Sequence, residues 1–109
     1  MKIPFKSLKI GAQRFSVELA AAVVRYEARI LGDSDMIQNR IRVVDGCHPL
    51  QVAETLVHEI CHAVLSDAGY QQDPELEAAI LRVSPRIAAL IADNPKQMHA
   101  LIDLFQNEA

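Results

Sequence analysis

The chain has 109 residues, half of them hydrophobic, and a formal net charge of −3 at pH 7. This length predicts one small domain over residues 1–109. An acidic balance without a basic cluster argues against nucleic acid as a partner. No apolar run approaches the roughly 20 residues of a membrane span. Residues 1–10 contain no apolar core of a secretory signal, so we expect a cytoplasmic protein without a membrane partner.

The first half of the chain is expected to be extended. Residues 14–19 alternate polar and apolar side chains, which is the period of a half-buried strand. Residues 20–23 favour a helix, whereas residues 24–30 alternate with period two, and we interpret the latter as a strand. Residues 32–35 carry a turn signal. Residues 40–44 then predict another strand.

The second half is expected to be helical. Pro49 suits the first turn of a helix that continues to Gly69. Asp73 and Pro74 begin a second helix, which reaches about residue 92 with an expected kink at Pro85. Pro95 begins a last helix, whose apolar stripe predicts core packing and consists of Met98, Leu101, Ile102 and Phe105. A small antiparallel or mixed sheet followed by three helices indicates an α+β fold.

Residues 58–62 read His-Glu-Ile-Cys-His within the first of these helices. His58 and His62 are four apart, so both imidazoles lie on one side of the helix and can reach one ion. Zn²⁺ favours such nitrogen ligands. Glu59 is about 100° further round the helix, which keeps it off the metal but within reach of a water activated by it. This arrangement is typical of zinc hydrolases, most of them peptidases.

A catalytic zinc usually has three protein ligands and one open position. The long metzincin pattern is excluded, because Leu65 and Ala68 stand where it needs glycine and histidine. A carboxylate on the next helix is the natural candidate. Glu75 shares its side with charged residues, whereas Glu77 shares its side with mostly apolar ones and so needs a partner. Helix geometry therefore favours Glu77 as the third ligand, and Glu75 is the alternative.

Several of these segments together resemble the minimal gluzincin-type zinc metallopeptidases of phages and bacteria. The resemblance covers about residues 35–95 and rests on 55–64, Gly69, the two glutamates and 91–95. It implies a zincin-like fold and Glu77 as the third ligand. In that family a strand precedes the motif helix, and Ile41-Arg42-Val43 stands in that place.

The sequence thus predicts a metalloprotease in which His58, His62 and Glu77 hold Zn²⁺. Glu59 would take a proton from water and deliver it to the leaving amine of a peptide or protein substrate. An extended peptide is expected to pair with the strand that contains Ile41, Arg42 and Val43. Tyr70 and His48 are candidates for an oxyanion or substrate contact, although a surface turn role is favoured for each.

The alternative function is a zinc-stabilised binding or adaptor domain that is catalytically silent. In a chain this small, a partner protein could complete the cleft. A structural zinc would be closed by a fourth protein ligand, for which His48 and Cys61 are the candidates. For Cys61 a role as a small core residue is favoured, and Cys47 and Cys61 form no disulfide scaffold. Glu59 favours the enzyme, because a structural zinc needs no base.

Overall fold

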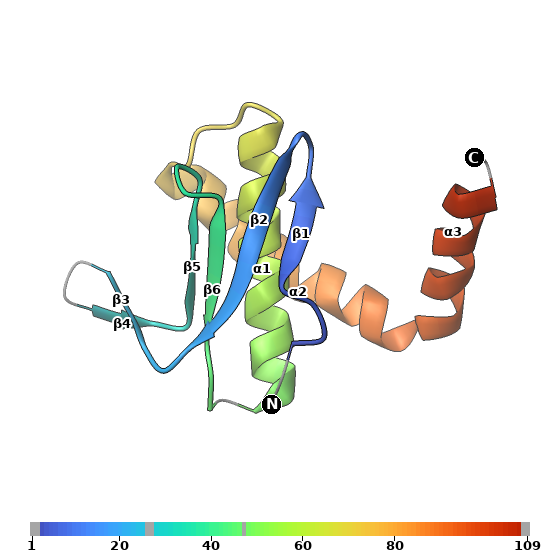
Figure 1. The fold of residues 1–109 in the computed structure, drawn as a ribbon, viewed down its shortest axis with the longest axis horizontal. Helices are drawn as coiled ribbons and strands as arrows, with labels where there is room; N and C mark the ends of the chain where they lie inside the picture. The colour runs from blue at the N-terminus through green and yellow to red at the C-terminus, as the bar shows by residue number, and fades with distance from the viewer. Residues whose placement is uncertain (1–2, 26–27, 47, 108–109) are drawn as a thin grey trace.

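Six strands precede three helices in the computed structural model, which describes residues 3–25, 28–46 and 48–107. The predicted α+β class is confirmed (Figure 1). The elements are β1 (Ser7–Ile10), β2 (Gln13–Ala20), β3 (Val23–Arg25), β4 (Ala28–Ile30), β5 (Gly32–Asp35), β6 (Arg40–Val44), α1 (Pro49–Asp67), α2 (Pro74–Asp93) and α3 (Pro95–Asn107).

Four of the strands form one mixed sheet in the order β1-β2-β6-β5. β2 and β6 are parallel, with Val17 opposite Ile41, while β5 runs antiparallel to β6, with Ser34 opposite Ile41. β6 is therefore an interior strand and β5 is an edge strand. β3 and β4 pair separately as an antiparallel hairpin. The described residues of 24–30 are extended as expected, but they form two short paired strands instead of one, and 26–27 lie outside the described residues. The helix favoured for residues 20–23 is wrong, because Ala20 ends β2 and Val23 begins β3.

The turn expected at residues 32–35 is wrong, because these residues form β5. Their polar composition resembles a turn signal, but charged residues are also common in edge strands. The register with β6 places Gly32 and Ser34 opposite the buried Val43 and Ile41, on the face that α1 covers. Asp33 and Asp35 alternate to the outer face.

The helix boundaries follow the capping residues in the sequence. Pro49 is at the start of α1, which ends just before Gly69, whose φ of +93° suits glycine. The Asp73 carboxylate accepts a hydrogen bond from the Leu76 backbone N–H at 2.8 Å and so caps α2. α2 continues as one helix through Pro85.

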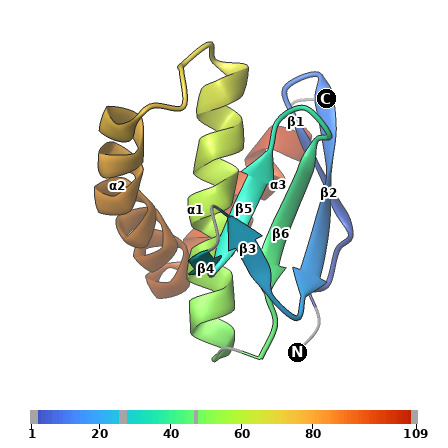
Figure 2. The same ribbon diagram turned by 90° about the vertical axis from the view of Figure 1, so that its left-hand side faces the viewer.

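The molecule is layered, with the sheet on one side of α1 and α2 on the other (Figure 2). The core lies between the sheet and α1. Its buried side chains are Ile10, Phe15, Ile41, Val43, Val52 and Ala63, and partly buried Leu8, Leu19, Met36, Leu56 and Ile60 pack against them. No helix in the described ranges is long and apolar enough to cross a membrane.

α3 extends away from these layers (Figure 1). The core packing expected for its apolar stripe is wrong, since none of its described residues is buried. Phe105 is 73% exposed and Ile102 is 52% exposed. The spacing of the stripe correctly indicates an amphipathic helix, but an amphipathic pattern does not specify which surface covers it.

Candidate metal centre

Helix α1 presents two neighbouring faces with different contents. Its buried residues recur at three- and four-residue spacing and are Val52, Thr55, Glu59 and Ala63. This line faces the sheet. His58 and His62 are rotated from it by about 100° and face α2. The base candidate and the ligand candidates therefore point towards different neighbouring elements although they are adjacent in sequence.

His58, His62 and Glu77 are brought together between α1 and α2. Their potential ligand atoms all lie within 4.8 Å of one another. His58 Nε2 is 3.2 Å from Glu77 Oε1, and His62 Nε2 is 2.5 Å from Glu77 Oε2. Tetrahedral zinc with bonds of about 2.0–2.1 Å holds its ligand atoms about 3.3–3.5 Å apart. The cluster thus has the donor types and approximate spacing of three zinc ligands.

The outer nitrogen of each imidazole also has a partner. His62 Nδ1 lies 2.6 Å from Gln72 Oε1, and Gln72 Nε2 donates to the His62 carbonyl at 3.4 Å, which orients the amide. An amide oxygen only accepts, so His62 carries its hydrogen on Nδ1. In the neutral imidazole the Nε2 lone pair then faces the Glu77 carboxylate oxygen. Two such hydrogen-bond acceptors come this close only when a cation or a proton lies between them. His58 Nδ1 is similarly 3.3 Å from the hydroxyl of buried Ser84.

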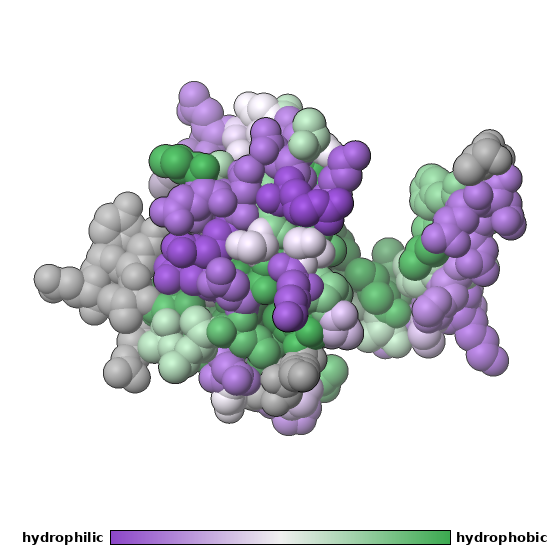
Figure 3. Space-filling model, in the orientation of Figure 1, coloured by the Kyte–Doolittle hydropathy of each residue, from purple (hydrophilic) through white to green (hydrophobic). Residues whose placement is uncertain are grey.

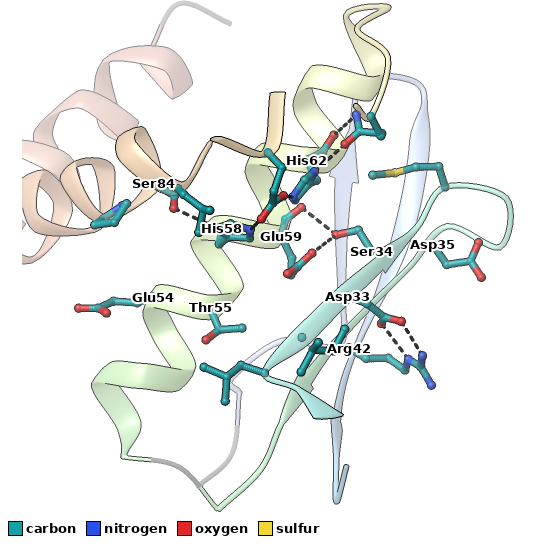
Figure 4. A pocket seen from close by; sticks show the side chains of 18 of the residues that line it. Asp33, Ser34, Asp35, Arg42, Glu54, Thr55, His58, Glu59, His62 and Ser84 are labelled. Carbon is teal, nitrogen blue, oxygen red and sulfur yellow. Dashed lines mark hydrogen bonds and ion pairs between the residues drawn. The ribbon is translucent and has the colours of Figure 1, made fainter. Parts of the chain in front are cut away.

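Glu59 is held from the opposite side by β5. Its side chain is buried, at 6% exposure, and the Ser34 hydroxyl lies 2.8 Å from Oε1 and 3.0 Å from the Glu59 carbonyl. Burial raises the pKa of the Glu59 carboxyl, while the Ser34 hydrogen bond and the nearby imidazoles lower it. Glu59 is thus a buried acid with a dedicated hydrogen-bond donor, beside the ligand cluster and not in it (Figure 4).

A glycine allows β5 to approach α1 this closely. A Cβ atom built on Gly32 would lie 2.8 Å from both the Arg42 carbonyl oxygen and Thr55 Cγ2, and 3.4 Å from Glu59 Cγ. Any larger residue would push the edge strand away from the helix. Gly32 therefore sets the distance at which Ser34 meets Glu59.

An open groove of about 1090 Å³ lies between β5 and the two helices. Figure 4 shows His58, Glu59 and His62 along one wall and Ser34 opposite them. The floor and walls come from β5 with its flanking residues, from α1, and from the start and middle of α2. Its lining residues include Ser34, His58, Glu59, His62, Gln72, Glu77 and Ser84, and also the acidic Asp33, Asp35, Glu54 and Asp73.

Other residues predicted for the site lie apart from it. His48 caps α1, with Nδ1 accepting from the Leu50 N–H at 3.1 Å, and Tyr70 is 60% exposed. Neither is among the residues that line the groove, and the oxyanion or substrate contact stays a prediction for both. Each occupies the surface turn position that the sequence favoured. Glu75 is exposed and is absent from the ligand cluster.

Cys61 is a half-buried free thiol whose pKa is raised by burial, and it is not part of the ligand cluster. Its place fits the favoured role of a small packing residue. Cys47 lies outside the described residues. Among the described residues no fourth His, Cys, Asp or Glu joins the three ligand candidates.

The predicted substrate pairing with Ile41, Arg42 and Val43 is wrong. β6 already pairs with β2 on one side and β5 on the other, so its backbone groups are used within the sheet. Arg42 is also engaged, because its guanidinium donates two hydrogen bonds to Asp33, of 2.9 and 2.6 Å. The hydrogen bonds to the Asp33 carboxylate raise the pKa of Arg42.

Three supporting residues were missed by the sequence reasoning, namely Ser34, Gln72 and Ser84. Ser84 lies seven residues, or about two helical turns, after Glu77 on the same side of α2, and this spacing is the sequence signal for its contact with His58. Gln72 and Ser34 carried no comparable signal, since one lies in a loop and the other in a segment interpreted as a turn.

Comparisons of the chain with protein-family models, with curated proteins and with solved structures found no match. No family is assigned on this basis. The resemblance to the minimal gluzincins stays a prediction.

Proposed function

We propose that the protein is a zinc-dependent hydrolase of zincin-like architecture that cleaves peptide bonds. The donor set supports zinc, because two imidazole nitrogens and one carboxylate are the ligands of many catalytic zinc sites. Their outer contacts with Gln72 and Ser84 support it further, since metal-binding histidines are usually oriented through the second ring nitrogen. Bound zinc would supply Lewis-acid chemistry and lower the pKa of water.

The observation that carries hydrolysis, beyond metal binding, is the buried Glu59. A buried carboxylate is costly unless it is paired or serves a function. Ser34 holds Oε1, while Oε2 accepts no hydrogen bond from the described residues and is free for water in the groove. Glu59 would take a proton from that water and return it to the leaving amine.

The edge of β5 is the proposed place for the substrate backbone. β5 lines the groove, and no other described strand pairs with its outer side. An extended peptide could add there through main-chain hydrogen bonds, which would bring a scissile bond past Glu59 and the ligand cluster. Peptides or proteins are therefore the proposed substrates, and the reducing cytoplasm is the proposed location, consistent with the free Cys61 thiol.

The test combines metal analysis with cleavage of a peptide library by the purified protein. We expect about one zinc per chain, removed by chelator with loss of thermal stability. Glu59→Gln should retain zinc and abolish cleavage, since an amide cannot accept the proton. Exposed Glu18→Gln, on β2 and outside the groove, is the matched control and should retain both.

Two results would refute the proposal in distinct ways. Full zinc occupancy in both His58→Ala and His62→Ala would refute the metal site. Zinc binding without cleavage of any library member would refute the hydrolase and favour the zinc-stabilised binding domain, in which Glu59 has no catalytic role.

A further inference from the structure

The C-terminal end of the chain exposes a continuous apolar surface. We define the helical arm as residues 88–107, the last turns of α2 together with α3. Six of its large apolar side chains are between 46% and 73% exposed, namely Leu90, Ile91, Leu101, Ile102, Leu104 and Phe105. Figure 3 shows that α3 turns its hydrophobic side towards the body, across an open notch, and its hydrophilic side away.

The arm is held in this extended position by its own backbone. Asn94 is the single residue between α2 and α3. Its Nδ2 donates to the Leu90 carbonyl at 2.9 Å, and its own carbonyl accepts from the Met98 N–H at 2.9 Å. Pro95 further restricts the conformation of Asn94. Asn94 thus takes part in the end of α2 and the start of α3, and no longer linker is present between the two helices.

The accessible surface is larger than a chain of this size normally exposes. A folded monomer of this mass has about 6,000 Å² of accessible surface by the general scaling law. The observed value is 7972 Å² for 12.1 kDa. The whole chain thus exposes about 2,000 Å² more than the scaling law gives, to which the extended arm contributes, and a standard interface needs only about 800 Å² from each partner. A 13-residue helix such as α3 is also marginal without a packing partner.

We infer that the helical arm is the interface of a symmetric homodimer, in which α3 of each copy enters the notch of the other. Each chain carries both the notch and the stripe. A two-fold axis therefore fills both notches with the stripes of the two copies, and the assembly closes as a dimer instead of growing into a filament. Charge does not oppose this contact, because the only acidic or basic residues of the arm are Asp93, Lys96, His99 and Asp103. The metal cluster lies elsewhere, between α1 and α2, so this inference is independent of the proposed function.

The oligomeric state in solution tests the inference. Light scattering after gel filtration of the full chain should give twice 12.1 kDa. Leu101→Lys should raise the dimer dissociation constant at least about tenfold, whereas Ala100→Lys, next to it on the outer side of α3, should not. On α2, Ile91→Lys should act like Leu101→Lys, with Ala92→Lys as its control. Circular dichroism and zinc titration check that each variant is folded.

Three outcomes would overturn the inference. The first is a wild-type monomer at all concentrations, because the arm would then be covered by something other than a second copy. The second is a dimer that persists in both Leu101→Lys and Ile91→Lys, since it must then use another surface. The third is equal dissociation of the stripe and control variants, which would show a general effect of lysine on the helices.

Discussion

Replacing Ser34 by alanine should destabilise the metal-free protein more at about pH 8 than at about pH 4. The Ser34 hydroxyl lies 2.8 Å from an oxygen of Glu59, whose side chain is only 6% exposed. A hydrogen bond to a charged group contributes about 1.5–3 kcal/mol, and a neutral one about 1 kcal/mol. We therefore expect the free energy of unfolding to fall by about 1.5–3 kcal/mol where Glu59 is ionised.

The pH dependence follows from the direction of the pKa shift. Burial raises the pKa of Glu59 in the folded state above its ordinary value of 4.5, so its ionisation disfavours the fold. Stability is accordingly lost as the pH rises through the folded pKa. Because the Ser34 hydrogen bond lowers that pKa, its removal raises the folded pKa further and increases the loss above it. Well below 4.5 the carboxyl is protonated in both states, and only the neutral hydrogen bond is lost.

Urea unfolding in the presence of a chelator measures this effect at both pH values. The Ser34→Ala loss should shrink in a Glu59→Gln background, and this double-mutant cycle cancels the titration of the histidines. Ser16→Ala, the same change in strand β2, is the control. A Ser34→Ala loss that is equal in both backgrounds and independent of pH would refute the proposed pairing of hydroxyl and carboxylate.

Zinc titration should rank three substitutions around the ligand cluster. Glu77→Ala should weaken zinc binding at least about 100-fold. Gln72→Ala should weaken it about 10–100-fold, because His62 loses its outer hydrogen-bond partner, and Glu75→Ala should change it little. A stronger effect of Glu75→Ala than of Glu77→Ala would contradict the ligand assignment. In a separate test, Gly32→Ala should lower the free energy of unfolding by about 1–3 kcal/mol through overpacking. Thr55→Ser removes the methyl group that lies 2.8 Å from the new Cβ and should recover part of that loss in urea unfolding, whereas an unchanged stability of Gly32→Ala would contradict the close approach of β5.

The helices and the cluster between them could be predicted because their signals are local. Pro49, Gly69 and the Asp73-Pro74 pair fix where α1 and α2 begin or end, and helix periodicity then fixes which side chains share a face. This was sufficient to choose Glu77 over Glu75 as the residue that meets the histidines, as the structure places it. The choice of Glu77 did not depend on the conformation of the loop between α1 and α2.

The sheet was harder because strand order depends on distant pairing. The segment 40–44 was recognised, but nothing within it shows that β2 and β5 occupy both of its edges. Residues 32–35 have the composition of a turn, and only their pairing with β6 makes them a strand. Substrate pairing was predicted for β6 because β5 was interpreted as a turn, which left β6 as the expected edge of the sheet.

The one-residue offset between His58 and Glu59 would let this small fold separate the two tasks of the proposed function, which are holding a metal ion and accepting a proton. The histidines face α2, which supplies Glu77 and Ser84, while Glu59 faces β5, which supplies Ser34. Each task is thus supported by a different neighbour of the same helix. The groove lies where these neighbours diverge, so a ligand in it contacts both sides at once. A helix with the same motif but without β5 would retain the candidate ligands and leave Glu59 without its hydrogen-bond donor, so the edge strand belongs to the candidate site as much as the motif does.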